Sequence, residues 1–516
     1  MAKKYLIGVD LGTSSTKTAI YTLRGDLMAQ ASLDVNLTYP APGQVEQESE
    51  DFYTTAAQTV QTCIRESGLD PREVAAVACD SQMAGIGSVD ESFHPAGPFD
   101  SWLDMRCEPY ISWMEKDASD RIIELTGCPA TCDHGPKMLW AKHERPDEYA
   151  RVAKFVTPAG YVAGRMAGLR GDQAFMDTTF IHFSGFSDSR NMAWSEELCG
   201  QFGLDIQKLP RIVDPWDLAG ELTENAAKDF GLAPGTLVSA GCGDTAACTL
   251  GAGLVRPGML LDIAGTASVF AATTDSFVAD RSNRALLNMH SVIPGLYHPL
   301  AYIAGGGLAL RWFRDQFYNT SRGAMLPPDG DLYAEMEEAI RAIPPGADGL
   351  FFSPHLGGRV CPSSPEMRGA WLGFSWGHTR AHFYRAILES VAFEYAWYLR
   401  ILLEQMEGLA LLEARAAGGG ARSLLWNQMK ANVLGLPFRR LAHSELGTWG
   451  AALVAGKTAG IYTDLAAAAD ELCVVERDVI LPEPEIQAAY ARLSQRFSAM
   501  EDRLAEYYRE IHEGQE

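Results

Sequence analysis

The chain has 516 residues, a formal charge of −23, and ordinary hydrophobic (47%) and charged (21%) fractions. This length is too great for a single hydrophobic core, so two large domains or a few smaller ones are expected. The acidic balance argues against nucleic-acid or membrane-surface partners, because both require a basic face.

Two features predict a cytoplasmic location. Asp10 interrupts the short apolar run that follows Lys3 and Lys4, so no signal peptide is expected, and no uncharged run is long enough to span a membrane. The ten cysteines are scattered along the chain, which is typical of proteins from a reducing compartment.

The chain begins with a polar loop between two apolar runs. Residues 5–9, 16–22 and 27–35 are predicted strands. Gly12 lets a ligand approach the backbone, Thr13 and Ser14 offer hydroxyls beside N–H groups that cradle phosphate oxygens, and a carboxylate at a strand end can hold Mg²⁺. An ordinary polar turn is the alternative. The polar residues that this motif contributes are Asp10, Gly12, Thr13, Ser14 and Lys17.

Two later strands also end in polar loops. Residues 74–79 lead into the loop 80–85, and residues 237–240 lead into the loop 241–245. Ligands of open α/β sheets bind at such strand ends. We therefore expect these loops to contribute to a binding site.

Asp244 is the most informative carboxylate of these loops. It follows two glycines, Gly241 and Gly243, and the small residues from Thr245 onward predict a helix that begins beside it. An aspartate in this setting can accept a proton from a substrate hydroxyl or help to hold Mg²⁺, as phosphoryl transfer requires. A simple helix cap is the alternative, and the spacing leaves both interpretations open.

The segment 102–106 is a second candidate site. An aromatic residue with an acid and a base nearby, here Trp102, Asp104 and Arg106, suits a polyhydroxylated ligand. A surface salt bridge beside a buried tryptophan is the alternative.

Residues 259–272 repeat the opening pattern about half a chain length later. An apolar strand again runs into a small loop, containing Gly265 and Thr266, and then into another strand. This repeat predicts two similar α/β halves, each of which brings a phosphate loop to a shared cleft. The boundary is expected near Pro257, which gives domains of residues 1–256 and 257–516.

The second half contains a long predicted helix at 381–407 and a final helix from about Pro484. Residues 450–458 resemble a P-loop but have the wrong glycine spacing and a helical pattern. The final helix has an unbroken four-three apolar spacing, which suits either a seam between the subunits of a homodimer or packing on its own domain.

Several motifs resemble those of the FGGY carbohydrate kinases, in particular the xylulokinase-like members. The resemblance extends nearly end to end. It includes the opening loop, a signature at 135–144, a longer spaced signature at 369–389, a second phosphate motif at 263–266 and an adenosine motif at 418–423.

The resemblance implies two ribonuclease-H-like α/β domains of the actin-like ATPase superfold with an interdomain cleft. It implies that Asp244 is the catalytic base and that Asp10 and Asp244 lie near Mg²⁺. The implied acceptor-binding residues are Gln82, Met83, Trp102, Asp104, Arg106, Asp244 and Thr245. The implied ATP-binding residues are Gly12, Thr13, Ser14, Lys17, Gly265, Thr266, Gly419, Gly420, Ser423 and Asn427.

The expected activity is therefore ATP-dependent phosphorylation of a terminal hydroxyl of a ketopentose, with xylulose as the leading acceptor. Three departures from the xylulokinase pattern bear on the acceptor: Ala84 replaces a histidine, residues 358–362 replace a Gly-Glu-Arg-Thr-Pro stretch, and Cys132 and His134 deviate from the first signature. Ribulose, L-xylulose, erythritol, glycerol and gluconate stay open as acceptors. A non-kinase ATPase of the same superfold and a sugar sensor are the alternatives from other classes.

Overall fold

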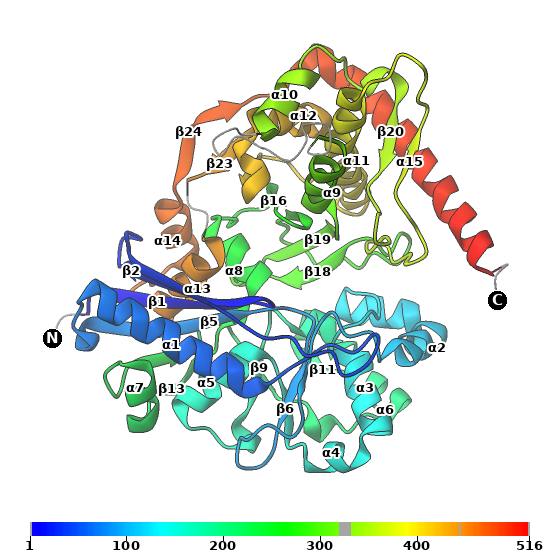
Figure 1. Cartoon of the computed structure of the whole chain (residues 1–516). Coiled ribbons are helices and arrows are strands. Elements are labelled where there is room, and N and C mark those ends of the chain that lie inside the picture. Colours follow the sequence, from blue (N-terminus) through cyan, green and yellow to red (C-terminus); the bar gives the residue numbers. More distant parts are fainter. Residues whose placement is uncertain (1–2, 319–331, 443–444, 514–516) are drawn as a thin grey trace.

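The computed structural model describes residues 3–318, 332–442 and 445–513. Its backbone forms two large mixed sheets, one above the other in Figure 1, with helices around each. No helix in these described ranges combines the length and the apolar character that crossing a bilayer requires.

The first sheet has parallel strands at its centre and antiparallel strands at both sides. The opening loop joins β1 to β2, as the sequence predicts. The strand order is β13 (Leu218–Glu221), β14 (Leu237–Ser239), β5 (Val74–Ser81), β1 (Tyr5–Leu11), β2 (Ser15–Thr22) and β3 (Leu27–Asp34), with β15 (Cys242–Gly243) pairing with the end of β5.

The second sheet repeats this topology. β16 and β17 form an antiparallel hairpin, as β1 and β2 do, and β16 is parallel to its other neighbour β22, as β1 is to β5. The internal repeat and the two-domain α/β fold are thereby confirmed. The order is β18 (Leu287–His290), β19 (Tyr297–Ile303), β17 (Ser268–Ala272), β16 (Met259–Ala264), β22 (Glu413–Ala417), β23 (Phe438–Leu441) and β24 (Val475–Ile480).

Helices cover both faces of the first sheet, so every residue of the central strand β5 is buried. One face is covered by α1 (Ser49–Ser67) and α5 (Pro158–Ala167), with α7 (Glu224–Phe230) packed against both of them. The other face is covered by α13 (Leu446–Thr458), which also packs against α8 (Asp244–Gly251). A helix from the second half of the chain therefore completes the core of the first sheet (Figure 1).

Glycines allow α13 to approach this closely. A Cβ on Gly8 of β1 would lie 1.8 Å from the carbonyl oxygen of Thr448, and a Cβ on Gly450 would lie 2.0 Å from the carbonyl oxygen of Ala247 in α8. Residues 450–458 are thus helical, as predicted, and Gly450 serves helix packing.

Gly450→Ala is expected to destabilise the protein by about 1–3 kcal/mol, because the added methyl group meets backbone atoms that cannot move independently. The midpoint of guanidinium-induced unfolding measures the effect. Gly200→Ala is the control, because a Cβ there meets nothing within 4 Å. Equal midpoints for the two variants would contradict the proposed role of this contact.

The remaining elements of the first half form a region beside the first sheet. Its core contains Met114, Phe180 and Phe202. The helices are α2 (Glu108–Thr126), α3 (His134–Glu144), α4 (Pro146–Arg151) and α6 (Glu196–Phe202). The short strands are β4 (Glu46–Gln47), β6 (Gly87–Val89), β7 (Phe99–Asp100), β8 (Lys154–Val156), β9 (Phe175–Asp177), β10 (Ser187–Asp188), β11 (Ala193–Trp194) and β12 (Arg211–Val213).

In the second domain, the long helix α11 (Arg380–Gln405) packs on the sheet and on the final helix α15 (Pro484–Glu513). Tyr490 and Phe497 of α15 are buried against Phe393 of α11, so this helix packs on its own domain. The other elements are α9 (Gly306–Phe313), α10 (Leu332–Ile340), α12 (Leu424–Leu434), α14 (Leu465–Leu472), β20 (Phe351–Ser353) and β21 (Ala370–Leu372).

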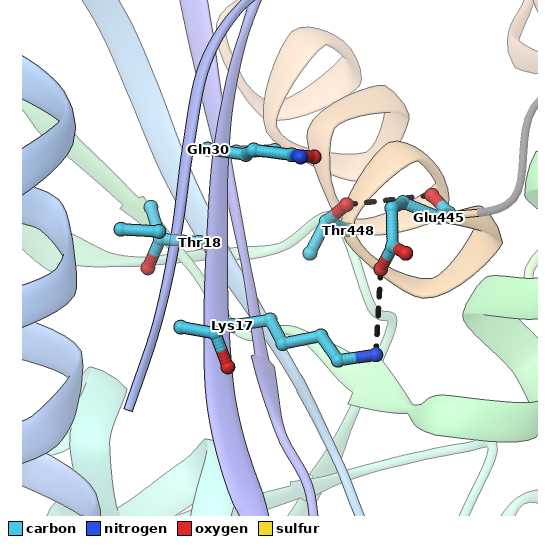
Figure 2. A pocket seen from close by; sticks show the side chains of 8 residues that line it. Lys17, Thr18, Gln30, Glu445 and Thr448 are labelled. Carbon is cyan, nitrogen blue, oxygen red and sulfur yellow. Dashed lines mark hydrogen bonds and ion pairs between the residues drawn. The ribbon is translucent and has the colours of Figure 1, made fainter. Parts of the chain in front are cut away.

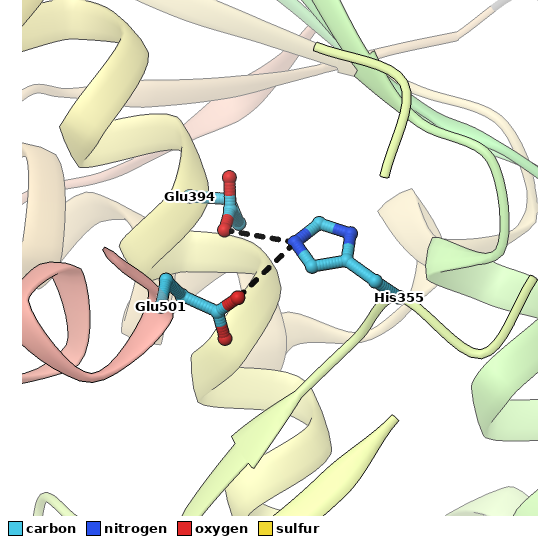
Figure 3. Close-up of side chains that lie close together, drawn as sticks. All are labelled: His355, Glu394 and Glu501. Carbon is cyan, nitrogen blue, oxygen red and sulfur yellow. Dashed lines mark hydrogen bonds and ion pairs between the residues drawn. The ribbon is translucent and has the colours of Figure 1, made fainter. Parts of the chain in front are cut away.

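A buried polar cluster also holds α15 in place (Figure 3). The ring of His355 points between Glu394 of α11 and Glu501 of α15, with its Nε2 3.2 Å from Glu394 Oε1 and 3.4 Å from Glu501 Oε2. Arg359 donates to the second oxygen of Glu394 at 3.1 Å. Burial, followed by the charge of Glu394, raises the pKa of Glu501 to about 8.

Glu501 makes a contribution to stability that declines with rising pH, whereas the lowered pKa values of Glu394 and His355 act in the opposite direction. Glu501 binds its proton more tightly in the folded protein than in the unfolded chain, where its pKa is 4.5. Its contribution is therefore complete below about pH 4.5 and is lost as the pH rises through about 8.

Glu501→Gln, which mimics the neutral form, should weaken this pH dependence. Urea unfolding midpoints of the wild type and the variant, measured between pH 5 and 9, test the expectation. The unfolding midpoints of the two proteins should converge at pH 5, and the variant should have the higher midpoint at pH 9. Parallel pH profiles would contradict it.

Candidate active site

Three carboxylates gather where the strands of the first sheet end. Asp10 of β1 and Asp80 of β5 are directly paired in the parallel register, and Asp80 also pairs with Cys242 of β15. Asp244 begins α8 immediately after β15. The sequence analysis placed Asp80 in a loop expected to contribute to a binding site, but it assigned individual roles only to Asp10 and Asp244.

The chain presents Asp244 by means of a sharp turn. Gly241 has a φ of 87°, and a Cβ there would lie 2.2 Å from the carbonyl oxygen of Cys79, so only glycine fits. The Oδ1 atom of Asp244 accepts hydrogen bonds from the backbone N–H and the hydroxyl of Thr245. Thr245 thus orients Asp244, and its place among the acceptor-binding residues stays a prediction.

The surroundings of Asp244 favour proton transfer near neutral pH. Burial raises the pKa of its carboxyl to about 7, and the charge of Asp10 acts in the same direction. Burial also raises the pKa of Asp10, against the opposing charge of Lys17, and raises the pKa of Asp80 well above its usual range. A carboxylate with a pKa near the working pH is suited to act as a general base.

Lys17 connects the first loop to the start of α13 (Figure 2). Its Nζ lies 3.4 Å from Oε2 of Glu445, and both residues line a cavity of about 240 Å³ together with Gln30 and Thr448. Lys17 was predicted to bind ATP. In this structure its amine is paired with a residue of the second half of the chain.

Three predicted residues meet at the end of β5, next to the first loop. The Thr13 hydroxyl accepts a hydrogen bond from Trp102 Nε1 at 2.8 Å and donates to Gln82 Oε1 at 3.4 Å. Gln82 Nε2 donates to Gln47, which sequence reasoning missed because it lies in a different segment. The structure therefore joins Thr13, assigned to ATP, to the residues assigned to the acceptor.

Met83 connects these residues to Asp244. The Met83 sulfur lies where a side chain on Gly243 would be, since a Cβ there would approach it to 2.1 Å. Gly243 immediately precedes Asp244. The predicted acceptor residues and the predicted base thus lie side by side.

Asp104 and Arg106 form a buried pair. Arg106 binds both oxygens of Asp104 and also donates to Glu46 at 2.6 Å, and Asp104 accepts from the backbone N–H of Val45 at 2.6 Å. The exposed fraction is 0% for Asp104, whereas that of Trp102 is 37%. The structure thus contains a salt bridge, but not the surface salt bridge beside a buried tryptophan that was the alternative, because the ion pair is buried and Trp102 is partly exposed.

A cavity of about 790 Å³ lies in the second domain, between the β16–β17 loop and the turn before α12. Its size suits a nucleotide. Five of the predicted ATP-binding residues line it, together with Trp426 and Tyr384, which sequence reasoning missed. The five are Gly265, Thr266, Gly419, Gly420 and Ser423.

The other predicted ATP-binding residues lie elsewhere. Asn427 is fully buried, and its Nδ2 donates to the carbonyl oxygen of Ala421, so it supports the glycine turn from behind. Gly12 and Ser14 belong to the first loop, where the backbone N–H of Gly12 donates to the carbonyl oxygen of Ser15 at 3.1 Å. None of these three residues lines the 790 Å³ cavity.

Comparisons with known proteins agree with this arrangement. Residues 5–251 match the N-terminal domain of the FGGY family of carbohydrate kinases, and residues 261–459 match its C-terminal domain. The xylulose kinase of Bacillus subtilis is 27% identical over 473 residues, which cover 91% of each chain. The gluconokinase of the same organism is 25% identical over 437 residues, which cover 83% of this chain and 82% of the relative.

A solved structure shows the same architecture. The crystal structure of xylulose kinase from Rhodospirillum rubrum superposes with a TM-score of 0.87 at 25% identity, covering 98% of this chain and 100% of the other. The two family domains together account for most of the sequence. The chain therefore belongs to the FGGY family of carbohydrate kinases.

Proposed function

We propose that this carbohydrate kinase transfers the γ-phosphoryl group of ATP to a terminal hydroxyl of a ketopentose, with xylulose as the leading acceptor. The observation that carries the proposal is the position of Asp244, which lies beside Met83 and begins a helix within the carboxylate cluster. The full-length similarity to xylulose kinases supports the choice of acceptor.

In the proposed mechanism, Asp244 accepts the proton of the attacking hydroxyl. Its Oδ1 is engaged by Thr245, which leaves Oδ2 to orient the hydroxyl. Gln82, Met83 and Trp102 are the proposed walls of the acceptor site, and the buried pair of Asp104 and Arg106 supports them. A positioned base contributes about 10²- to 10⁴-fold to such a reaction.

The carboxylate cluster suits Mg²⁺, which prefers oxygen ligands. Asp10 and Asp244 are the proposed residues that hold it, and neither oxygen of the neighbouring Asp80 has a hydrogen-bond donor among the described residues. The ion would supply charge neutralisation for the phosphates of the nucleotide.

The 790 Å³ cavity is the proposed site for the nucleoside and the inner phosphates, bound by Gly265, Thr266, Gly419, Gly420 and Ser423. Gly12, Thr13, Ser14 and Lys17 of the first loop are proposed to meet the outer phosphates when the domains close. This closure requires the Lys17 amine to leave its ion pair with Glu445 and to bind a phosphate oxygen instead. Asn427 is proposed to act through the turn that it supports.

Gluconate is a second candidate acceptor, because a gluconokinase matches most of the chain. The residues at the acceptor site also depart from the xylulokinase pattern at Ala84. Arg359, which belongs to the second departure, pairs with Glu394 in the buried cluster that holds α15, so we propose that this departure serves packing. Ribulose, L-xylulose, erythritol and glycerol are further acceptors to be tested.

ADP release in the presence of a panel of these compounds tests the proposal. We expect strong stimulation by a ketopentose, and product analysis identifies the hydroxyl that is phosphorylated. Stimulation by gluconate alone would identify gluconate, and not a ketopentose, as the acceptor. ADP release that no sugar or polyol stimulates would contradict both.

Three further properties of the protein are proposals of the same kind. We propose that the domains divide between residues 256 and 257, in the segment between α8 and β16. A cytoplasmic location and a homodimer stay predictions, to be tested by fractionation and by light scattering.

A further inference from the structure

We infer that Asp80 belongs to the divalent-cation site of this kinase, as a third carboxylate beside Asp10 and Asp244. This inference rests on the proposed function, because that proposal places the cation here. It adds a residue to which the sequence motifs assign no role.

The strand register brings Asp80 to the other carboxylates. Residues that are paired across neighbouring parallel strands point to the same face of the sheet, and Asp80 is paired with Asp10. Asp244 follows two residues after Cys242, which is the other register partner of Asp80. The three acids therefore come from three different segments and converge on one face of the sheet, at the carboxyl ends of its central strands.

The Asp80 carboxylate has no donor of its own. Its exposed fraction is 0%, and neither oxygen accepts a hydrogen bond from any residue that the structure describes. The groups that face it are Asp10 of β1, Lys17 of β2 and Asp244 of α8, and the Lys17 amine is engaged by Glu445 at 3.4 Å.

The start of α13 completes these surroundings. A Cβ on Gly447, in the first turn of this helix, would lie 3.5 Å from each Asp80 oxygen and 3.7 Å from the carboxyl carbon of Asp10. Glycine therefore leaves the space above both carboxylates open.

A cation accounts for this arrangement. A buried carboxylate without a donor is costly, and two more carboxylates nearby increase the cost. A divalent cation offsets both, and hard cations of this kind take carboxylate oxygens as ligands. The rival explanation is that Asp80 stays neutral and that its protonated carboxyl donates a hydrogen bond to Asp10.

Manganese binding distinguishes the two explanations without relying on turnover. Mn²⁺ is titrated into the protein in the presence of ADP, and the free ion is measured by electron paramagnetic resonance. The variants are Asp80→Asn, which keeps the shape and a hydrogen-bond donor, and Asp80→Ser, which is smaller in case the amide disturbs folding. The control is Asp280→Asn. Asp280 is also buried, but its oxygens accept hydrogen bonds from the backbone N–H groups of Asn283, Ala285 and Leu286.

We expect the Mn²⁺ dissociation constant to rise by about 10- to 100-fold in both Asp80 variants and to stay within about twofold in the control. Wild-type affinity in a folded Asp80→Asn protein would overturn the inference, as would a wild type that binds no Mn²⁺. A loss of affinity in the Asp80 variants together with a wild type that phosphorylates no acceptor would support the inference while rejecting the proposed function.

Discussion

Replacing Asp244 with asparagine is expected to lower the rate of acceptor phosphorylation by about 10²- to 10⁴-fold. The amide keeps the shape of the carboxylate, and its oxygen can still accept the hydrogen bonds of Thr245. It cannot accept the proton of the attacking hydroxyl. The loss should therefore appear in kcat, measured by coupled ADP release with the best acceptor of the panel.

Binding measurements separate this effect from a structural one. The nucleotide cavity is lined by residues of the second domain, so the ATP dissociation constant of Asp244→Asn, measured by calorimetry, should change by less than about tenfold. Asp280→Asn serves as the control, because it makes the same substitution at a buried aspartate of the second domain, which also contains the nucleotide cavity. Near-normal turnover by Asp244→Asn would refute its role as the base.

The second large effect is expected at Gly419. This residue lines the 790 Å³ cavity, and a Cβ there meets nothing within 4 Å, so a side chain would extend into the cavity without disturbing the protein. We expect Gly419→Val to raise the KM for ATP at least tenfold, which corresponds to about 1.4 kcal/mol of lost binding. The KM for the acceptor should stay unchanged.

Two other glycines make this test specific. Gly200→Val places the same side chain in open space on α6, and it should leave the KM for ATP unchanged. Gly420→Val is expected to lower stability instead, because a Cβ there would lie 2.4 Å from the ring of Trp426. An unaltered KM for ATP in a folded Gly419→Val protein would show that the nucleotide binds elsewhere.

The sequence alone determined the elements and the motifs. The strand–loop–strand patterns at Asp10 and Gly265, the helix that begins at Asp244 and the helical character of residues 450–458 were all predictable, because alternation of apolar residues and glycine placement are local properties. The repeat of the opening pattern also predicted that the two sheets share a topology.

Only the tertiary structure decided which of these residues meet. The register of β1 against β5 brings Asp80 to Asp10, the fold pairs Lys17 with Glu445, and it closes Arg106 onto Asp104 and Glu46. Helix α13 covers a sheet whose strands all come from the other half of the chain. Such contacts join segments far apart in the sequence, and they depend on strand pairing and close packing, for which no local pattern in a single sequence carries a signal.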